Sequence, residues 1–307
     1  MQRIVIKTND VDQRLDNFLK KAFPKLSLNA IYRHIRTKNI KINDKKCQPD
    51  YHLHLNDVLN IYINDDLLSK LPTHTDFLLA PANLNIVYED DNILIVNKPV
   101  GLVVHQDKTN TVDTLINRIK HYLYNKKVWN YQQENTFTPS LIHRIDRNTN
   151  GLILAAKNAK SLQILNAKLK THQIEKYYFC QVHGIINPPN GVLKGFLTRN
   201  LQTKIVKISQ HPINRQSQEI ITEYRTISHD RNISLLEIKL ITGKTHQIRA
   251  HLASINHPIV GEQKYTTPQY SYLKLKNHQQ LTAYKIIFNF KTDAEILNYL
   301  NHKTFKI

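Results

Sequence analysis

One short segment of this chain places an acid between two cations and follows it with a loop and an apolar run. The segment is HRIDRNTNGLILAAK, residues 143–157, and its acid is Asp146, flanked by Arg144 and Arg147. Side chains two apart in an extended segment point the same way, so Arg144 and Asp146 share a face if the segment is extended. A guanidinium keeps a nearby carboxylate ionised, and an ionised acid in a basic cleft can act as a nucleophile or a base. A buried ion pair or an Asx turn accounts for the same residues, so the spacing alone leaves both readings open.

The composition favours a polyanionic partner. Of the 307 residues, 43 are Lys or Arg and 24 are Asp or Glu, which gives a formal net charge of +19. So basic a chain attracts nucleic acid first, although charge that only maintains solubility is the alternative. The two cysteines, Cys47 and Cys180, argue against a disulfide scaffold and fit a reducing cytosol. The N-terminal residues do not resemble a signal peptide, and no apolar stretch is long enough to span a bilayer.

Two motifs suggest other chemistry but lack the residues that it requires. The letters GKT at 243–245 end a phosphate-binding loop only if glycine stands five residues before Gly243, where this chain has Ile238. This excludes a nucleoside triphosphatase of that type. Three histidines lie close together in sequence without the spacing of a zinc site, so we expect hydrogen bonding and RNA contact of them: His246, His251 and His257.

The first 65 residues are predicted to form a compact unit of two helices and strands. RLDNFLKKAF has helical spacing of its apolar residues and ends at Pro24, and Ser27 is a suitable cap for a second helix, LNAIYRHIRTK. NIKIND alternates as a strand before a turn at Asn43 and Asp44, and residues 54–63 are predicted to be another strand. Residues 66–80 show no period and are interpreted as a linker to a domain over 81–307.

Strands dominate that second domain. A hairpin is predicted over 85–99, followed by strands in LILAAK (152–157), KYYFCQVHG, ISLLEIKLI and KIIFNF, with one helix over 158–173. We therefore expect an α+β fold, in which a central mixed, mostly antiparallel sheet is flanked by helices.

At this point the motifs resemble a family. HRIDRNTNGLILAAK closely resembles the H-R-L-D-R-x-T-S-G-L-L-L-x-A-K signature of the RluA-type pseudouridine synthases. IVYEDDNILIVNKPVGLVVH, EKYYFCQVHG and LITGKTHQIRAHLASINHPIVGEQKY resemble three further motifs of that family, in its order. Residues 14–46 resemble the small α/β S4 RNA-binding domain that is often attached to it. Asn150, Glu262 and Thr282 depart from the family's usual Ser, Asp and His.

The resemblance implies isomerisation of uridine to pseudouridine in RNA, without a cofactor or a metal. Asp146 matches the essential aspartate of the family, and Arg249 matches its basic partner. Tyr178 matches the tyrosine expected to stack on the target base, and Ile248 is expected in the apolar wall of the pocket. Arg144 resembles a residue that can occupy the space that a flipped base leaves. The other expected substrate contacts are His143 and Arg147.

The S4-like unit and the length favour an enzyme of large-subunit (23S) ribosomal RNA, of type C with type D as the second choice, acting as a cytoplasmic monomer. A non-catalytic RNA-binding factor of ribosome assembly is the alternative. A nuclease or a methyltransferase is less favoured, because we find neither clustered acids nor a glycine-rich cofactor loop in the sequence.

Overall fold

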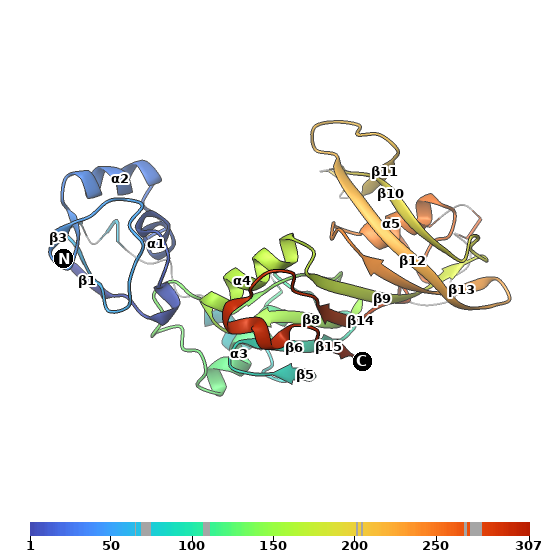
Figure 1. Cartoon of the computed structure of the whole chain (residues 1–307), viewed down its shortest axis with the longest axis horizontal. Helices are drawn as coiled ribbons and strands as arrows, with labels where there is room; N and C mark the ends of the chain where they lie inside the picture. The colour runs from blue at the N-terminus through green and yellow to red at the C-terminus, as the bar shows by residue number, and fades with distance from the viewer. Residues whose placement is uncertain are drawn as a thin grey trace.

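The structure is a computed structural model that describes residues 1–64, 66–68, 75–106, 111–200, 202–203, 205–266, 269–270 and 278–307. It confirms the predicted α+β class, with a small sheet in the N-terminal unit and a large, mostly antiparallel sheet in the rest (Figure 1). The molecule is elongated, with the N-terminal unit at one end. The large sheet runs from the middle of the molecule, where β5 (Ile86–Glu89) and β6 (Ile93–Lys98) lie, to the opposite end, where β10 (Asn190–Arg199) and β11 (Val206–Ser209) lie. Helix α4 (Ala159–Lys170) lies on the side of this sheet that is nearer the N-terminal unit.

The N-terminal unit contains the two predicted helices, α1 (Leu15–Ala22) and α2 (Leu28–Arg36). The Ser27 hydroxyl caps α2 by accepting a hydrogen bond from the Ala30 N–H at 3.2 Å, as predicted. Asn43 and Asp44 both have positive φ, which is the backbone of a tight hairpin turn. The sheet has the order β1-β4-β2-β3, with bounds Gln2–Val5, Val58–Ile61, Ile40–Ile42 and Lys45–Lys46. The strand predicted over 54–63 is therefore shorter, since only Val58–Ile61 forms β4.

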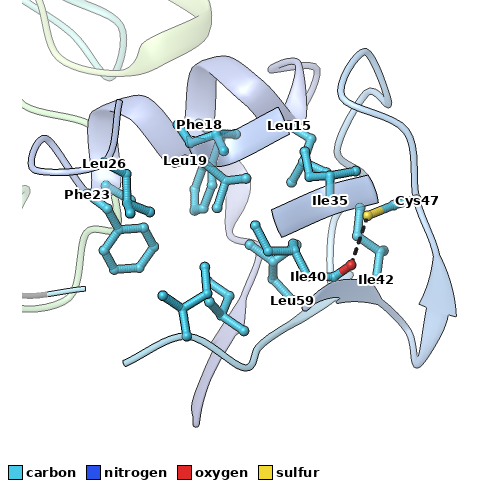
Figure 2. Close-up of a cluster of buried hydrophobic side chains, with 14 of the residues drawn as sticks. Leu15, Phe18, Leu19, Phe23, Leu26, Ile35, Ile40, Ile42, Cys47 and Leu59 are labelled. Atoms are coloured by element: carbon cyan, nitrogen blue, oxygen red, sulfur yellow. Dashed lines mark hydrogen bonds between the residues drawn. The ribbon is translucent and has the colours of Figure 1, made fainter. Parts of the chain in front are cut away.

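This unit has a hydrophobic core of its own. Leu15, Phe18 and Leu19 of α1 pack with Ile31 and Ile35 of α2 against the strands (Figure 2). Cys47 lies in the same core and is a free thiol whose Sγ donates to the Ile40 carbonyl at 3.4 Å. Burial of one apolar face from each helix explains why the helical spacing of the sequence is a good guide here.

The predicted linker over 66–80 falls partly outside the described residues, which omit 69–74. Residues Thr75–Leu79 form the short 3-10 helix η2, whose Phe77 is buried among residues that include Leu115 and Ile119 of α3 (Leu115–Asn125). The end of this segment thus packs into the second domain, and the domain boundaries remain predictions.

The N-terminal unit is joined to the second domain by polar contacts. Asp10 is fully buried and accepts hydrogen bonds from Asn135 Nδ2 at 2.7 Å and Thr136 Oγ1 at 3.0 Å. Asn9 accepts a bond from the Ala159 N–H at 3.0 Å, at the first turn of α4. These contacts fix the side of the second domain on which the N-terminal unit lies.

The path through the large sheet is β11-β10-β12-β13-β9-β14-β8-β6-β5, and two short strands pair beside it, β15 (Thr304–Lys306) with β14 and β7 (Ser140–Leu141) with β8. The bounds of the path strands, in that order, are Val206–Ser209, Asn190–Arg199, Gln218–Asp230, Ile233–Leu240, Ile174–His183, Leu281–Phe288, Asn150–Ala156, Ile93–Lys98 and Ile86–Glu89. Among the described strands, the pair β8–β14 is parallel and every other pair is antiparallel. The sheet therefore brings β8, which follows Asp146, close to β9, which carries Tyr178.

Two further helices complete this domain. Helix α5 (Gln247–Ser254) follows β13 and packs Ile248 and Leu252 on the core formed with Tyr178 of β9. The 3-10 helix η3 (Glu295–Leu300) packs beside α4. None of the helices in the described ranges is both long and apolar enough to cross a membrane.

Candidate active site

Asp146 lies in a tight turn at the start of β8. The Thr149 N–H donates to the Asp146 carbonyl at 3.1 Å, and the buried Thr149 hydroxyl accepts from Gln279 Nε2 at 2.6 Å. The next residues enter β8, where Gly151 has a φ of +117° and lies against β14. A Cβ on Gly151 would stand 2.2 Å from the Ala283 carbonyl oxygen, so only glycine allows β14 to approach here. The turn and its glycine together hold the acid at the N-terminal end of β8, an interior strand of the sheet.

A lysine beneath this turn holds its backbone from the other side. The Lys98 ammonium is buried and donates to the carbonyls of Arg147 at 3.0 Å, Leu102 at 2.8 Å and Pro99 at 2.8 Å. The Gly101 N–H donates to the same Arg147 carbonyl at 2.9 Å. Burial lowers the pKa of Lys98 to about 8, although the charge of Asp146 acts in the opposite direction. Lys98 thus fixes the residue that follows Asp146.

Arg249 of α5 holds the Asp146 side chain. Its Nη1 donates to Asp146 Oδ2 at 2.7 Å, while its Nε and Nη2 donate to the two oxygens of Glu262 at 2.7 and 2.8 Å. Burial acts to lower the pKa of Arg249, but the hydrogen bonds and charge of Glu262, together with Asp146, hold that pKa above its ordinary value. The guanidinium therefore stays charged between two acids, one of them buried and the other open to the pocket.

Tyr178 forms the floor of the pocket beside Asp146. It lies on β9, and burial, followed by the nearby charge of Asp146, raises the pKa of its hydroxyl. The phenol therefore remains protonated, and its ring offers a flat apolar surface. The pocket brings five predicted residues together, and its described lining is Arg144, Ile145, Asp146, Thr149, Tyr178, Leu240, Lys244, His246, Gln247, Ile248, Arg249 and Leu281.

Two predicted substrate contacts lie outside this lining. Nε2 of His143 accepts a hydrogen bond from the Leu154 N–H of β8 at 3.3 Å. Burial, with a smaller contribution from Lys176, lowers the pKa of His143 to about 3, so the imidazole is neutral. The exposed Arg147 donates from Nε to the Gly101 carbonyl at 3.0 Å. Substrate contact by these two residues stays a prediction.

Comparison with known proteins decides the family. The model of the RNA pseudouridylate synthase family matches residues 92–254, which is more than half of the chain, and the S4 domain model matches residues 13–59. The chain belongs to the RNA pseudouridylate synthase family. Its resemblance to the RluA-type members with an S4 domain is confirmed by relatives named ribosomal large subunit pseudouridine synthase C or D.

Individual members of the pseudouridylate synthase family resemble the chain over most of its length. It is 36% identical over 309 residues to an uncharacterized RNA pseudouridine synthase of Mycoplasma capricolum, which covers 99% of this chain and 96% of the relative. It is 32% identical to ribosomal large subunit pseudouridine synthase C of Buchnera aphidicola subsp. Baizongia pistaciae, over 97% of this chain and 89% of the relative. The solved structure of human RNA pseudouridylate synthase domain containing 1 has the same fold, with a TM-score of 0.55 and 20% identity over 69% of this chain and 81% of that one. The chain is thus an isomerase that acts on uridines of RNA.

Three residues that hold or border Asp146 in this candidate site are not singled out as site residues by the sequence. Glu262 was noted only as a departure from the family's usual acid, Lys98 only as a letter in a motif, and His246 only as one of three nearby histidines. Each acts through a contact that is distant in sequence or depends on the bend of the backbone. The feature of the sequence that could have identified them is that all three lie within the family's motifs.

Proposed function

We propose that this chain isomerises uridines of large-subunit (23S) ribosomal RNA, with Asp146 as its catalytic residue. The observation that carries the proposal is the state of the Asp146 carboxylate. One oxygen is held by Arg249, the other lies 3.9 Å from Nε2 of His246, and the side chain is open to the pocket beside Tyr178. The ribosomal target is supported by relatives that are named ribosomal large subunit pseudouridine synthase C, with type D as the second choice.

The reaction conserves atoms. The N1–C1′ bond breaks, the uracil turns, C5 bonds to C1′, and the proton that leaves C5 is balanced by the one that N1 gains. Asp146 either attacks the sugar carbon or takes a proton from the ribose, and both routes require an ionised carboxylate beside the glycosidic bond. The hydrogen bond from Arg249 holds one carboxylate oxygen and aims the side chain. Binding of the target base against Tyr178 and Ile248 gives the uracil a flat apolar surface on which to turn.

The target uridine must leave the RNA stack before it can reach this pocket. Flipping it out costs a few kcal/mol, and we propose that Arg144, which is exposed at the pocket, occupies the space that the base leaves. The exposed Arg147 is proposed to contact a phosphate, and His143 to contact the substrate.

The N-terminal unit supplies a second RNA contact. Its exposed basic residues include Arg33, Arg36, Lys38, Lys45 and Lys46, and the polar junction at Asp10 fixes its position. Two linked weak sites bind RNA more tightly than either alone. We further propose that the enzyme works as a cytoplasmic monomer without cofactor or metal.

The test is pseudouridine mapping in a deletion strain. Ribosomal RNA from cells that lack the gene is treated with carbodiimide and mapped by primer extension, and stops that disappear identify the target. Re-expression of the wild type should restore them, whereas Asp146→Asn, which keeps the size and removes the charge, should lower the rate in vitro by about 10³-fold or more. Unchanged stops in the deletion strain would favour a non-catalytic RNA-binding factor. A wild-type rate for Asp146→Asn would exclude Asp146 as the catalytic residue.

A further inference from the structure

His246 stands between β13 and α5, immediately before the helix that carries Arg249. Its φ is +55°, in the left-handed region, and its side chain lines the pocket. Such conformations persist only where the surrounding structure requires them, and they cluster at functional sites. This backbone conformation directs the imidazole toward the loop that contains Asp146.

The two ring nitrogens of His246 face different partners. Nδ1 lies 2.6 Å from the Tyr265 hydroxyl oxygen, and Nε2 lies 3.9 Å from Asp146 Oδ1. Asp146 Oδ2 is the oxygen bonded to Arg249, so the histidine faces the oxygen that Arg249 leaves open. Catalytic hydrogen bonds are often long in a structure without substrate and shorten when it binds. Here Nε2 and Oδ1 are 3.9 Å apart, so a small rotation of the carboxylate would bring them within hydrogen-bond distance.

The surroundings of Tyr265 determine which nitrogen of His246 carries the proton. The Tyr265 oxygen accepts a hydrogen bond from the Val206 N–H at 3.2 Å, which leaves its own proton free to be donated to Nδ1 of the histidine. Burial raises the pKa of Tyr265, so that proton is retained. If Nδ1 accepts, the proton of a neutral imidazole lies on Nε2, which is the nitrogen that faces Asp146.

The charges around His246 agree with a neutral ring. Burial lowers its pKa, Arg249 and Lys264 act in the same direction, and Asp146 and Glu262 oppose them. These groups come from the turn before β8, from α5 and from the segment that follows α5. The ring is therefore held at one nitrogen by Tyr265 and presents an N–H from the other.

We propose that His246 is a positioning residue, whose Nε2–H becomes the second hydrogen-bond donor to the Asp146 carboxylate when the uridine enters. Arg249 then holds Oδ2 and His246 holds Oδ1, which fixes the rotation of the carboxylate about its Cβ–Cγ bond. Tyr265 acts one step further away, since it selects the ring tautomer. This inference rests on the proposed catalytic role of Asp146. The competing interpretation is that His246 binds RNA directly, as the sequence suggested for the three histidines.

Two variants of His246 separate these interpretations. In His246→Gln the amide nitrogen can reach the position of Nε2, so the donor to Asp146 is kept. In His246→Asn the shorter amide reaches only the position of Nδ1, and asparagine tolerates the left-handed backbone well. We expect His246→Asn to lower kcat by about 10- to 100-fold and His246→Gln by about threefold or less, with RNA affinity unchanged in both.

Tyr265→Phe supplies an independent measurement. The ring that lies 5.3 Å from the Arg249 guanidinium is kept and only the hydroxyl is lost. We expect kcat to fall by about 3- to 10-fold, and the double variant Tyr265→Phe/His246→Asn to fall no further than His246→Asn alone, because both changes act on one chain of hydrogen bonds. Thermal unfolding of each variant checks that the fold is kept.

The rates are measured in single turnover with saturating enzyme on the RNA fragment that the mapping identifies, and the Kd on the same fragment. Equal kcat values for the Gln and Asn variants, or a loss confined to Kd, would overturn the inference. If the wild type itself forms no pseudouridine on any fragment, the proposed function fails instead, and the two failures are thereby distinguished.

Discussion

The chain contains the pattern Arg-x-Asp twice, at Arg14–Asp16 and Arg144–Asp146, and among these described residues only the first aspartate forms an ion pair with the arginine of its own pattern. Arg14 and Asp16 of the N-terminal unit are joined at 2.8 Å, with the arginine side chain 45% exposed and the acid 5% exposed. Asp146 of the second domain is joined to Arg249 at 2.7 Å, with the arginine 12% exposed and the acid 26% exposed. In the first pair the acid is inside and the cation outside, and in the second the order is reversed.

The two aspartates also differ in how many hydrogen bonds their side chains accept. Both oxygens of Asp16 are occupied, by Arg14 at 3.2 and 2.8 Å, by the Asn17 N–H at 2.8 Å and by the Tyr32 hydroxyl at 3.1 Å. Among the described residues, the Asp146 side chain accepts one hydrogen bond, from Arg249, whose other nitrogens donate to Glu262. The oxygens of Asp16 are thus filled by neighbouring groups, whereas Oδ1 of Asp146 accepts no hydrogen bond from a described residue, and Glu262 binds the other nitrogens of its arginine.

The largest effect is expected for the substitution Arg249→Leu. Removal of the guanidinium releases Asp146 and leaves Glu262, whose side chain is 1% exposed, buried without its partner. We expect kcat to fall by about 100-fold or more and the free energy of unfolding by about 3 kcal/mol or more. Single-turnover rates and urea unfolding measure the two effects.

Arg249→Lys is the control for this prediction, because it keeps the charge but not the three-way geometry. If Arg249 positions Asp146, RNA affinity should change far less than the rate for both variants. Equal losses of affinity and rate would make Arg249 a phosphate contact and remove the contrast with Arg14.

Much of the fold follows from local patterns in the sequence. The two N-terminal helices and the helix α4 were predicted because each buries one regular apolar face. The cap at Ser27 and the hairpin β5–β6 were predicted from a capping side chain and from an acidic turn between two apolar runs. Helix α5 was not predicted. It begins at a left-handed His246 without a side-chain cap, and buried Gln247 and His251 interrupt its apolar face. Its position is determined by the sheet on which it packs.

The site shows the same division. The sequence suggested that Asp146 and Arg144 share a face, because side chains two apart in an extended segment do. In the described part of the structure no ion pair joins them, and Arg249, which is 103 residues away, is the partner. The pairing of Asp146 with Arg249 was predicted from the resemblance to the family, because the spacing of residues in the sequence could not predict it. Glu262 and Lys98 depend on tertiary contacts in the same way.

A smaller effect is expected when the second acid is neutralised. In Glu262→Gln the arginine keeps Asp146 as its only carboxylate, so its guanidinium is less firmly held. We expect kcat to fall by about tenfold and RNA affinity to stay unchanged. Glu262→Asp, the residue usual in the family, keeps the charge with a side chain shorter by one methylene. We expect its rate to lie between those of the wild type and Glu262→Gln, and a rate for Glu262→Gln equal to the wild type would show that Asp146 needs no held arginine.

The smallest effect on the rate is expected at the N-terminal pair. In Asp16→Asn an amide replaces the oxygen that accepts from Arg14 and Tyr32, so the unit should lose about 1–2 kcal/mol of stability. Single-turnover kcat should not change, because Asp16 lies outside the described lining of the pocket. Asp50→Asn is the matched control, since it removes an exposed charge that acts on Arg14 only through its electrostatic field, without a hydrogen bond between the two described side chains. Hydrogen exchange of the amides in 1–64 reports the local stability.

The stability difference between the wild type and Asp16→Asn is expected to depend on pH. The hydrogen bond from Arg14 lowers the pKa of Asp16, although burial opposes it. A carboxyl whose folded pKa is lowered contributes stability above its unfolded value, about 3.9, and loses it as the pH falls through the folded value. The protection of the wild type over Asp16→Asn should therefore be full near neutral pH and vanish in acid. A difference that persists unchanged in acid would mean that the shape of the side chain, and not its charge, stabilises the unit.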